Sequence, residues 1–352
     1  MADVSIISTA SILPEQTVSN VEIGEKLIAG VMVDDEPAAD IVAQTRTRSE
    51  LIEKKTGLRS RHFFAEGTDP ADVGLQLLER LMDRSSWSDL DAVIVSSSST
   101  MGFPGLSQQM VAKARERHSA LGDPFVLDIN SNACTSFMYA LQIATAQIRG
   151  MGFRKVACIA IEFSSRCIAY DPLTFGTSTL FGDASAGVLL EAGKAGIATV
   201  EEVKASSLVN EDTIGLIKGG GMLASTPQTP VPRDVRWFMA GPPVAIGATK
   251  ILVGEIKRYQ EAGHAIDWLI PHQANLTRIL IPACQKVGID PEKLCASFAE
   301  TGNTSSASIP LLLDQLARSG KTAAGHNAVL IGFGASFSMG SALLRFTGNS
   351  QD

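Results

Sequence analysis

One cysteine of this sequence stands where a catalytic nucleophile would be placed. An apolar run over residues 125–129 predicts a short buried strand, and apolar-periodic residues over 137–148 predict a helix. Cys134 lies between them, in the first turn of that helix. Because unpaired N–H groups at a helix N-terminus stabilise negative charge, we expect a lowered pKa for this thiol and a usable thiolate near neutral pH. The alternative is a small buried side chain without chemistry, the commoner fate of an intracellular cysteine.

Two further segments supply polar groups suited to work with such a thiolate. His272 follows an apolar run over 268–270, and Asn303 lies in a Gly/Ser/Thr-rich loop that opens a helix. The end of a strand and the start of a helix are the places where α/β folds build sites. A thiolate can attack a thioester while an imidazole and an amide hold the charge that develops on a carbonyl or enolate oxygen. The alternatives are a core histidine and an ordinary turn residue.

The elements that would position these residues alternate between strands and helices. The apolar run over 90–97 predicts a strand that is buried on both faces, and the run over 156–161 predicts another strand. Helical patterns lie between such runs, and single helices are expected over 41–55 and, in spite of Pro282, over 276–287. The order of elements starts again near Gly196. We therefore expect an α/β fold with two similar halves, residues 1–195 carrying the cysteine and residues 196–352 carrying the histidine and the asparagine.

The composition argues against several classes of function. The chain has 352 residues, of which 45% are hydrophobic and 19% charged, as is typical of a compact soluble protein. The net charge of −7, without a long basic run, argues against a nucleic-acid partner. No apolar stretch approaches the ~20 residues that span a membrane, and the N-terminus does not have the pattern of a signal peptide. Five cysteines without a Cys-x-x-Cys spacing fit a reduced cytoplasm, so we expect neither disulfides nor a metal site.

Five short motifs stand along the chain in order: Asn132-Ala133-Cys134-Thr135-Ser136, Phe181-Gly182-Asp183-Ala184, Pro271-His272-Gln273-Ala274-Asn275, Gly302-Asn303-Thr304-Ser305 and Gly332-Phe333-Gly334-Ala335-Ser336. In their order and intervals they resemble the ketoacyl synthase III family, the acyl-CoA-primed condensing enzymes of the thiolase superfamily. The resemblance covers nearly the whole chain. It implies a thiolase-like five-layered αβαβα sandwich built from two duplicated halves, and usually a homodimer.

The resemblance also implies roles for single residues. Cys134 would take the acyl group as a thioester, and its backbone N–H, with that of Ala335, would form the oxyanion hole. His272 and Asn303 would bind the thioester carbonyl of a malonyl donor, promote loss of carbon dioxide and stabilise the enolate. The remaining positions expected to line the acyl tunnel or contact the carrier are Phe103, which matches a loop aromatic that enters the partner subunit's tunnel, and Phe175, Met239, Gly241, Asn275 and Phe333.

The same resemblance implies the substrates and partners. No tightly bound cofactor is expected, because coenzyme A or phosphopantetheine thioesters would be substrates. The partners would be an acyl-CoA or acyl-ACP, a malonyl thioester, an acyl carrier protein (ACP) and a second copy of the chain, in the cytoplasm. An acidic carrier protein would need a basic patch, for which the candidates are Lys54, Lys55, Arg59, Arg61, Arg233, Arg236 and Arg278.

Several positions depart from the family's coenzyme A contacts. Leu51 stands where the bacterial fatty-acid enzyme has a tryptophan that stacks on adenine, and Phe175 stands where an arginine completes that sandwich. Pro242 replaces an asparagine that binds pantetheine, and proline has no N–H to donate. These changes leave the chemistry intact but open the choice between coenzyme A and acyl carrier protein. They are what we would expect of a synthase in specialised metabolism.

Two other functions stay open at this point. One is an acyltransferase that moves the acyl group from Cys134 to an alcohol or amine without decarboxylation. The other is a non-catalytic subunit that partners an active homologue, against which the retained cysteine argues.

Overall fold

The computed structural model describes residues 2–30, 39–99, 103–130, 132–170, 172–193, 196–207, 209, 211–214, 216–218 and 237–349. The first residues of the predicted loop 101–105 and most of the irregular stretch 210–235 lie outside the described residues.

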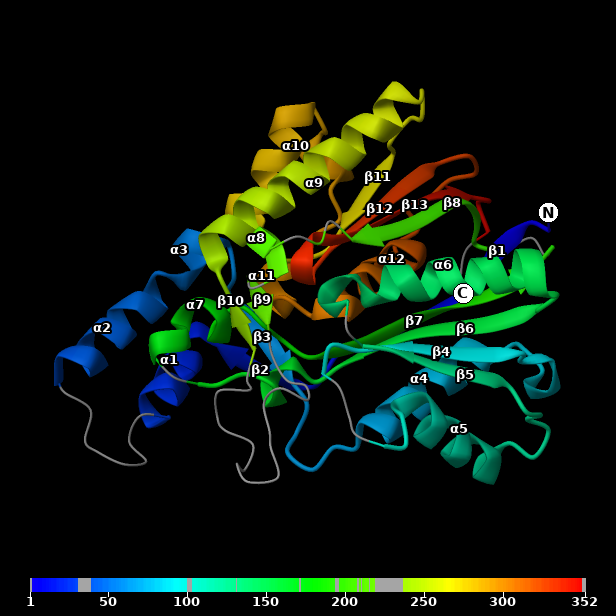
Figure 1. Ribbon diagram of the computed structural model, residues 1–352, viewed down its shortest axis with the longest axis horizontal. Coiled ribbons are helices and arrows are strands. Elements are labelled where there is room, and N and C mark those ends of the chain that lie inside the picture. Colours follow the sequence, from blue (N-terminus) through cyan, green and yellow to red (C-terminus); the bar gives the residue numbers. More distant parts are fainter. Residues whose placement is uncertain are drawn as a thin grey trace.

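The protein is built of five layers (Figure 1). Helices α4 (Pro70–Met82) and α5 (Leu106–Arg117) form one outer layer, and α9 (Gly241–Glu261) and α10 (Ile281–Val287) form the other. Two sets of strands lie inside them, and α6 (Ser136–Met151) and α12 (Ser308–Arg318) fill the centre. This is the thiolase-like αβαβα arrangement that the family resemblance implied.

The alternation of apolar residues along the strands explains why each sheet is covered on both faces. In β4 (Ala92–Ser96), Ala92 and Ile94 pack in the central cluster with α6, whereas Val93 and Val95 pack against α4 and α5. Strand β12 (Asn327–Phe333) divides its side chains in the same way between the central helices and α9. Because successive side chains of a strand point to opposite faces, a continuous apolar run requires cover on both sides.

The strands join into one sheet in the order β11-β12-β13-β8-β1-β7-β6-β4-β5. Strands β4, β6, β7 and β1 repeat the order and the directions of β11, β12, β13 and β8, with one parallel pair followed by two antiparallel pairs. A short antiparallel pairing of β1 with β8 connects the two sets. The first of these sets lies within residues 1–195 and the second within residues 196–352.

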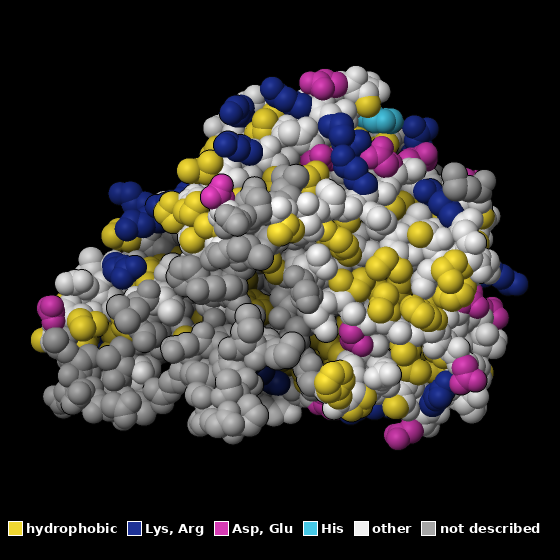
Figure 2. Space-filling view, in the orientation of Figure 1, with side chains coloured by type: hydrophobic (Ala, Val, Ile, Leu, Met, Phe, Trp, Pro, Cys, Tyr) yellow, Lys and Arg dark blue, Asp and Glu magenta, His cyan; other side chains and the backbone are white. Residues whose placement is uncertain are grey.

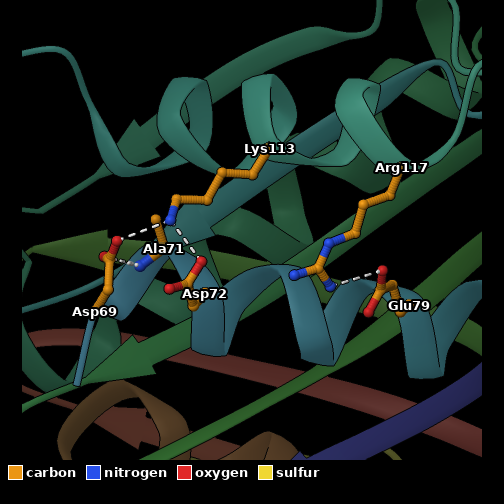
Figure 3. Close-up of polar contacts among 6 residues, drawn as sticks. All are labelled: Asp69, Ala71, Asp72, Glu79, Lys113 and Arg117. Atoms are coloured by element: carbon orange, nitrogen blue, oxygen red, sulfur yellow. Dashed lines mark hydrogen bonds and ion pairs between the residues drawn. The ribbon is translucent and has the colours of Figure 1, made fainter.

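The outer helices α4 and α5 are held together by exposed ion pairs (Figure 3). The Nζ atom of Lys113 lies 2.9 Å from Asp69 and also pairs with Asp72, and Arg117 lies 3.4 Å from Glu79. Asp69 is also the N-cap of α4, where it accepts the backbone N–H of Ala71. Exposed pairs of this kind contribute about 0–1 kcal/mol each, so the apolar core supplies most of the stability.

The other regular elements have the following bounds: β1 Val4–Ile12, β2 Gln16–Ser19, α1 Asn20–Ala29, α2 Ala39–Glu50, α3 Ile52–Thr56, β3 Ser60–Phe63, η1 Trp87–Asp89, β5 Phe125–Ile129, η2 Ala133–Thr135, β6 Lys155–Glu162, η3 Ser164–Arg166, η4 Pro172–Thr174, α7 Phe175–Ser178, β7 Ala184–Ala192, β8 Ala198–Ser207, α8 Glu211–Ile214, β9 Ile217–Lys218, β10 Phe238–Met239, β11 Trp268–Pro271, η7 Leu276–Leu280, η8 Pro291–Lys293, α11 Phe298–Thr301, η9 Ser305–Ala307, η10 Ala335–Phe337 and β13 Ser338–Phe346.

Two predicted helices are each divided in the structure. Residues 276–287 form a π-helical turn, η7, followed by α10, and Pro282 lies in the first turn of α10, where its missing N–H removes no helical hydrogen bond. Residues 41–55 are divided into α2 and α3 at Leu51. Within the described part of the chain, none of the helices has the length and apolar character needed to cross a membrane.

Candidate active site

The residues that the sequence singled out for chemistry meet where strands end. Cys134 follows β5, His272 follows β11 and Ala335 follows β12, and each of these strands has a parallel neighbour in the sheet. Asn303 lies between α11 and η9, and its backbone N–H is bonded to Leu180. The turns that carry Cys134 and Ala335 contact each other, and the turn η9 that follows Asn303 contacts the Cys134 turn. The site is therefore formed at the carboxyl ends of parallel strands, as predicted.

The thiol of Cys134 is closely surrounded by hydrogen-bond donors. The hydroxyl of Ser305 donates to its Sγ at 3.4 Å, and the side chain of Asn303 and the backbone N–H of Cys134 itself also interact with it. Cys134 lies in the 3-10 turn η2, directly before α6, and is partly accessible. Its placement at the helix N-terminus agrees with the prediction.

The expected lowering of the thiol pKa is not found. Burial raises the pKa of Cys134 to about 12, the nearby Glu162 carboxylate raises it further, and the donors at Sγ lower it only in part. The prediction weighed the helix N-terminus and could not weigh how deeply the folded chain encloses the sulfur. We therefore expect the thiol, not the thiolate, to be the resting form.

Asn303 is oriented by its own loop. Its side-chain oxygen accepts the backbone N–H of Ser305 at 2.8 Å. This contact leaves the amide nitrogen as the group that interacts with the thiol of Cys134. The loop reaches this position because Gly302, with φ of +66°, turns the chain where an added Cβ would lie 2.7 Å from the carbonyl oxygen of Leu180.

His272 is fully buried and held on several sides. Its Nδ1 lies 2.8 Å from the hydroxyl of Ser308, the backbone of Ser305 hydrogen-bonds to the ring, and the ring of Phe333 meets it edge-on at 5.0 Å. Burial lowers the pKa of His272 to about 3. The imidazole is therefore neutral at physiological pH. A neutral imidazole can donate a hydrogen bond to a carbonyl without transferring a proton to it.

Three residues of the site have a backbone conformation that is unusual for non-glycine residues. Ala133, Ser305 and Phe337 all have φ of +48°, and they are the non-glycine residues with positive φ among the described part of the chain. They lie in η2, η9 and η10, the three turns that carry Cys134, Ser305 and Ala335. Such conformations cost ~1–3 kcal/mol each and are retained where the surrounding contacts fix the chain, most often at active sites.

The turn of Ala335 can contact the turn of Cys134 because the preceding residue, Gly334, has no side chain. A Cβ built on Gly334 would lie 2.4 Å from Oγ1 of Thr135 and 2.8 Å from the carbonyl oxygen of Asn132, so only glycine allows the two turns to touch. We expect Gly334→Ala to push the turns apart, to lower the free energy of unfolding by ~1–3 kcal/mol and to slow acyl loading at least tenfold. Thermal unfolding and the loading rate would measure this.

A matched control is Gly254→Ala in α9, where an added Cβ meets nothing within 4 Å. That change should stabilise the helix by ~0.5–1 kcal/mol and leave loading unchanged. Equal loading by Gly334→Ala and wild type would mean that the contact of the two turns is dispensable.

The buried carboxylate of Glu162, which was not predicted from the sequence, lies next to the site and holds its loops by hydrogen bonds. Glu162, at the end of β6, accepts the backbone N–H groups of Ser98, Ser99 and Ser306 and the hydroxyls of Ser99 and Ser306. It thereby connects the loop after β4 to η9. Burial raises its pKa, and these hydrogen bonds lower it. In the sequence, the feature that could have indicated this role is a charged residue at the end of an apolar strand.

The residues expected at the tunnel and the carrier lie in several places. Phe175 and Met239 pack on one apolar cluster with Trp237, and the guanidinium of Arg48 lies 3.9 Å from the centre of the Phe175 ring. Arg48 was not among the residues that the sequence singled out. Gly241 begins α9.

Two of the remaining expected positions have local or separate surroundings. Asn275 caps η7, where its side-chain oxygen accepts the backbone N–H of Arg278 at 2.9 Å, so its visible role is structural. Phe103 does not reach the site of its own chain. Its side chain is fully exposed and lines a surface hollow of about 440 Å³ beside β5, together with Leu127 and Asp128.

The basic candidates fall into different groups. Lys54, Lys55 and Arg278 are exposed, and α3 is joined to η7 by the bond from Thr277 to the Lys55 carbonyl. Arg61 was wrongly assigned to the surface: it is fully buried and donates to the carbonyls of Val18 and Thr179. Arg59 pairs with Glu300. Arg233 and Arg236 lie outside the described residues. On the face shown in Figure 2, Lys and Arg side chains gather over the layer of α9 and α10.

Among the residues that the structure describes, no group of three or more His, Cys, Asp or Glu side chains is placed to hold a metal ion.

Comparison with known families agrees with this geometry. Residues 127–207, which include Cys134 and Glu162, match the 3-oxoacyl-[acyl-carrier-protein] synthase III family. Residues 257–346, which include His272, Asn303 and Ala335, match the C-terminal part of the same synthase. Both matched segments point to the same synthase, so the chain is similar to ketoacyl synthase III in each of its halves.

Solved structures show the same fold over nearly the entire ketoacyl synthase III-like chain. The synthase III from Pseudomonas aeruginosa is similar with a TM-score of 0.77 and 25% identity, over 99% of this chain and 100% of that one. The priming β-ketosynthase from the R1128 polyketide biosynthetic pathway gives 0.78 and 26%, over 98% and 97%. The synthase III from Thermus thermophilus gives 0.79 and 24%, over 98% and 100%.

Proposed function

We propose that this protein is a decarboxylating condensing enzyme that uses Cys134, His272 and Asn303. The observation that carries the proposal is the convergence of a thiol, a neutral imidazole and a primary amide on one residue, Ser305. These three groups are what acyl transfer to sulfur and stabilisation of an enolate require.

In the loading step, Cys134 would take an acyl group from a thioester. The sulfur attacks the acyl carbon, the bond between that carbon and the carrier's sulfur breaks, and the carrier leaves as a thiol with the proton that Cys134 gives up. The backbone N–H groups of Cys134 and Ala335 would hold the oxyanion of the tetrahedral intermediate. The contact between their turns supports this role. Removing one such donor typically costs ~10²–10³ in rate.

In the condensation step, His272 and Asn303 would hold the thioester carbonyl of a malonyl donor. The hydroxyl of Ser308 accepts the backbone N–H of Gln273 at 3.4 Å, so its own proton can be donated to Nδ1 of His272. With Nδ1 accepting from Ser308, the imidazole proton would be on Nε2, from which it would be donated to an enolate oxygen. The bond to the carboxylate breaks, carbon dioxide leaves, and the enolate carbon attacks the acyl-cysteine, releasing the sulfur.

The carrier is proposed to be an acyl carrier protein or a coenzyme A bound in an altered way. Phe175 is the residue that stands in place of the family's arginine, and Arg48 stacks on its ring. This contact supports an altered mode of coenzyme A binding. The exposed Lys54, Lys55 and Arg278 would offer positive charge to an acidic carrier. The similarity to a priming synthase of a polyketide pathway supports specialised metabolism.

A homodimer is proposed from the edge of the sheet. Strand β5 is the last strand in the order, and both Phe125 on it and Phe103 beside it are exposed. An open edge with exposed aromatic residues is suited to pairing with a second copy.

The pKa of His272 gives a prediction for pH. Because burial lowers it to about 3 from an ordinary value of 6.5, we expect decarboxylation by pre-acylated enzyme to keep its rate between pH 8 and pH 5. Single-turnover release of carbon dioxide would measure this, and a loss of rate centred near pH 6.5 would contradict it. The same shift should weaken the fold as pH falls from 6.5 toward 3, since the unfolded chain alone binds the proton there.

The proposed function is tested by product analysis. Enzyme supplied with an acyl thioester and malonyl-ACP or malonyl-CoA labelled at the free carboxyl should release one labelled carbon dioxide for each β-ketoacyl product. Acyl esters or amides formed without carbon dioxide would instead establish an acyltransferase.

A further inference from the structure

Ser305 lies at the point where the three proposed catalytic residues meet. Its Oγ is 3.4 Å from Sγ of Cys134, its backbone N–H is bonded to Asn303 at 2.8 Å, and its backbone hydrogen-bonds to the imidazole of His272. It is also fully buried. Its hydroxyl is therefore directed at the reacting sulfur by contacts on both sides of the backbone.

The hydroxyl of Ser305 is held from behind by a second hydroxyl. Oγ of Ser98 lies 2.7 Å from Oγ of Ser305, and the backbone N–H of Ser98 is bonded to Glu162 at 2.9 Å. The next residue along η9, Ser306, donates its N–H to the same carboxylate at 3.1 Å. If Ser98 donates to Ser305, then Ser305 must direct its own proton toward Sγ, and donors in such a chain strengthen one another.

The backbone of Ser305 is kept in an unusual conformation to make this contact. Its φ is +48°, and the bonds from Ser305 N–H to Asn303 and from Ser306 N–H to Glu162 fix the peptides on either side. A glycine would adopt this conformation at no steric cost, but it has no hydroxyl.

We propose that Ser305 is a catalytic residue whose hydroxyl donates a hydrogen bond to the sulfur of Cys134 and stabilises its thiolate during acyl loading. The inference rests on the proposed function, in which Cys134 is the nucleophile. Hydrogen bonds to an ionised acceptor are shorter and roughly twice as strong as neutral ones, so the contact tightens when the thiolate forms. No proton is transferred to Ser305, which keeps its own throughout. Ser98 and Glu162 are positioning residues, because they act through Ser305.

The surroundings of Cys134 give this donor a specific task. Burial and the Glu162 carboxylate both disfavour negative charge on the sulfur, and the hydrogen bond from Ser305 is the strongest of the opposing influences on its pKa. A thiol enclosed in this way needs such a donor to supply thiolate.

The test is the rate at which iodoacetamide alkylates Cys134 in the full-length protein between pH 7 and pH 9, followed by intact mass. This rate follows the thiolate fraction and needs neither acyl donor nor malonyl thioester, so it can succeed or fail independently of the proposed reaction. We expect Ser305→Ala to be alkylated about 10- to 100-fold more slowly at every pH, as the loss of one hydrogen bond to a charged group predicts. A steric or structural role alone would leave the rate unchanged or raise it, because alanine opens space beside the sulfur.

Two further variants keep the result interpretable. Ser305→Gly relieves the positive φ while removing the same hydroxyl, so it should be more stable than Ser305→Ala and equally slow to alkylate. Thr304→Val removes the adjacent buried hydroxyl, which has no hydrogen-bond partner in the described structure, and should alkylate at the wild-type rate. Wild-type alkylation rates in both folded Ser305 variants would overturn the proposal.

Discussion

Cys134→Ala should abolish acyl loading while the protein stays folded. The substitution removes one sulfur from a partly accessible position, and the surrounding turns are fixed by backbone contacts that do not involve the thiol. The sulfur is the only group in the proposed mechanism that forms the covalent bond, so the loading rate should fall by at least ~10³-fold. Intact-protein mass spectrometry after incubation with acyl thioesters would show the missing adduct, and circular dichroism would show the retained fold.

The matched control is another cysteine. Cys284 lies in the outer helix α10, and the Cys284→Ala variant should be acylated at the wild-type rate. A Cys134→Ala protein that turned over like wild type would remove this residue from the mechanism.

His272→Ala should separate the two half-reactions. Loading depends on Cys134, its oxyanion hole and Ser305, so it should stay within a few-fold of wild type. Decarboxylation loses a donor to the developing enolate and should slow by ~10²–10³-fold. Release of carbon dioxide from malonyl donor by pre-acylated enzyme is the measurement.

Since His272 is buried against Ser308 and Phe333, the alanine variant also leaves a hydroxyl without its partner. His272→Gln keeps a polar side chain near Ser308 and serves as the comparison for stability. Equal release of carbon dioxide by either variant and wild type would refute the assigned role.

Local patterns were sufficient to predict an α/β fold and to single out the three central residues, whereas the five layers were implied by the resemblance to a known family. Continuous apolar runs such as that of β4 specify strands covered on both faces, and strand ends in parallel sheets are the general location of α/β sites. Cys134, His272 and Asn303 were each placed by a short segment whose order along the chain also matched a known family.

What the sequence did not indicate depends on contacts between distant segments. Glu162 is bonded to Ser306, the neighbour of Ser305, only in the folded chain, where β6 meets η9. The pKa of Cys134 is raised because the whole protein encloses the thiol. The helix N-terminus, which suggested a lowered pKa, is a local feature of the sequence. Arg61 has the sequence context of a surface charge, yet it is buried where Gly182 and Gly302 pack closely against its Cβ.

The most direct test of the account is a chase of the acyl-enzyme. The protein would be incubated with a panel of acyl-CoAs and acyl-ACPs, the adduct on Cys134 located by mass, and malonyl-ACP or malonyl-CoA then added. The account predicts that the adduct disappears with release of carbon dioxide and appearance of a β-ketoacyl product. An adduct that ignores malonyl donors and clears with an alcohol or amine, or no adduct at all, would contradict it.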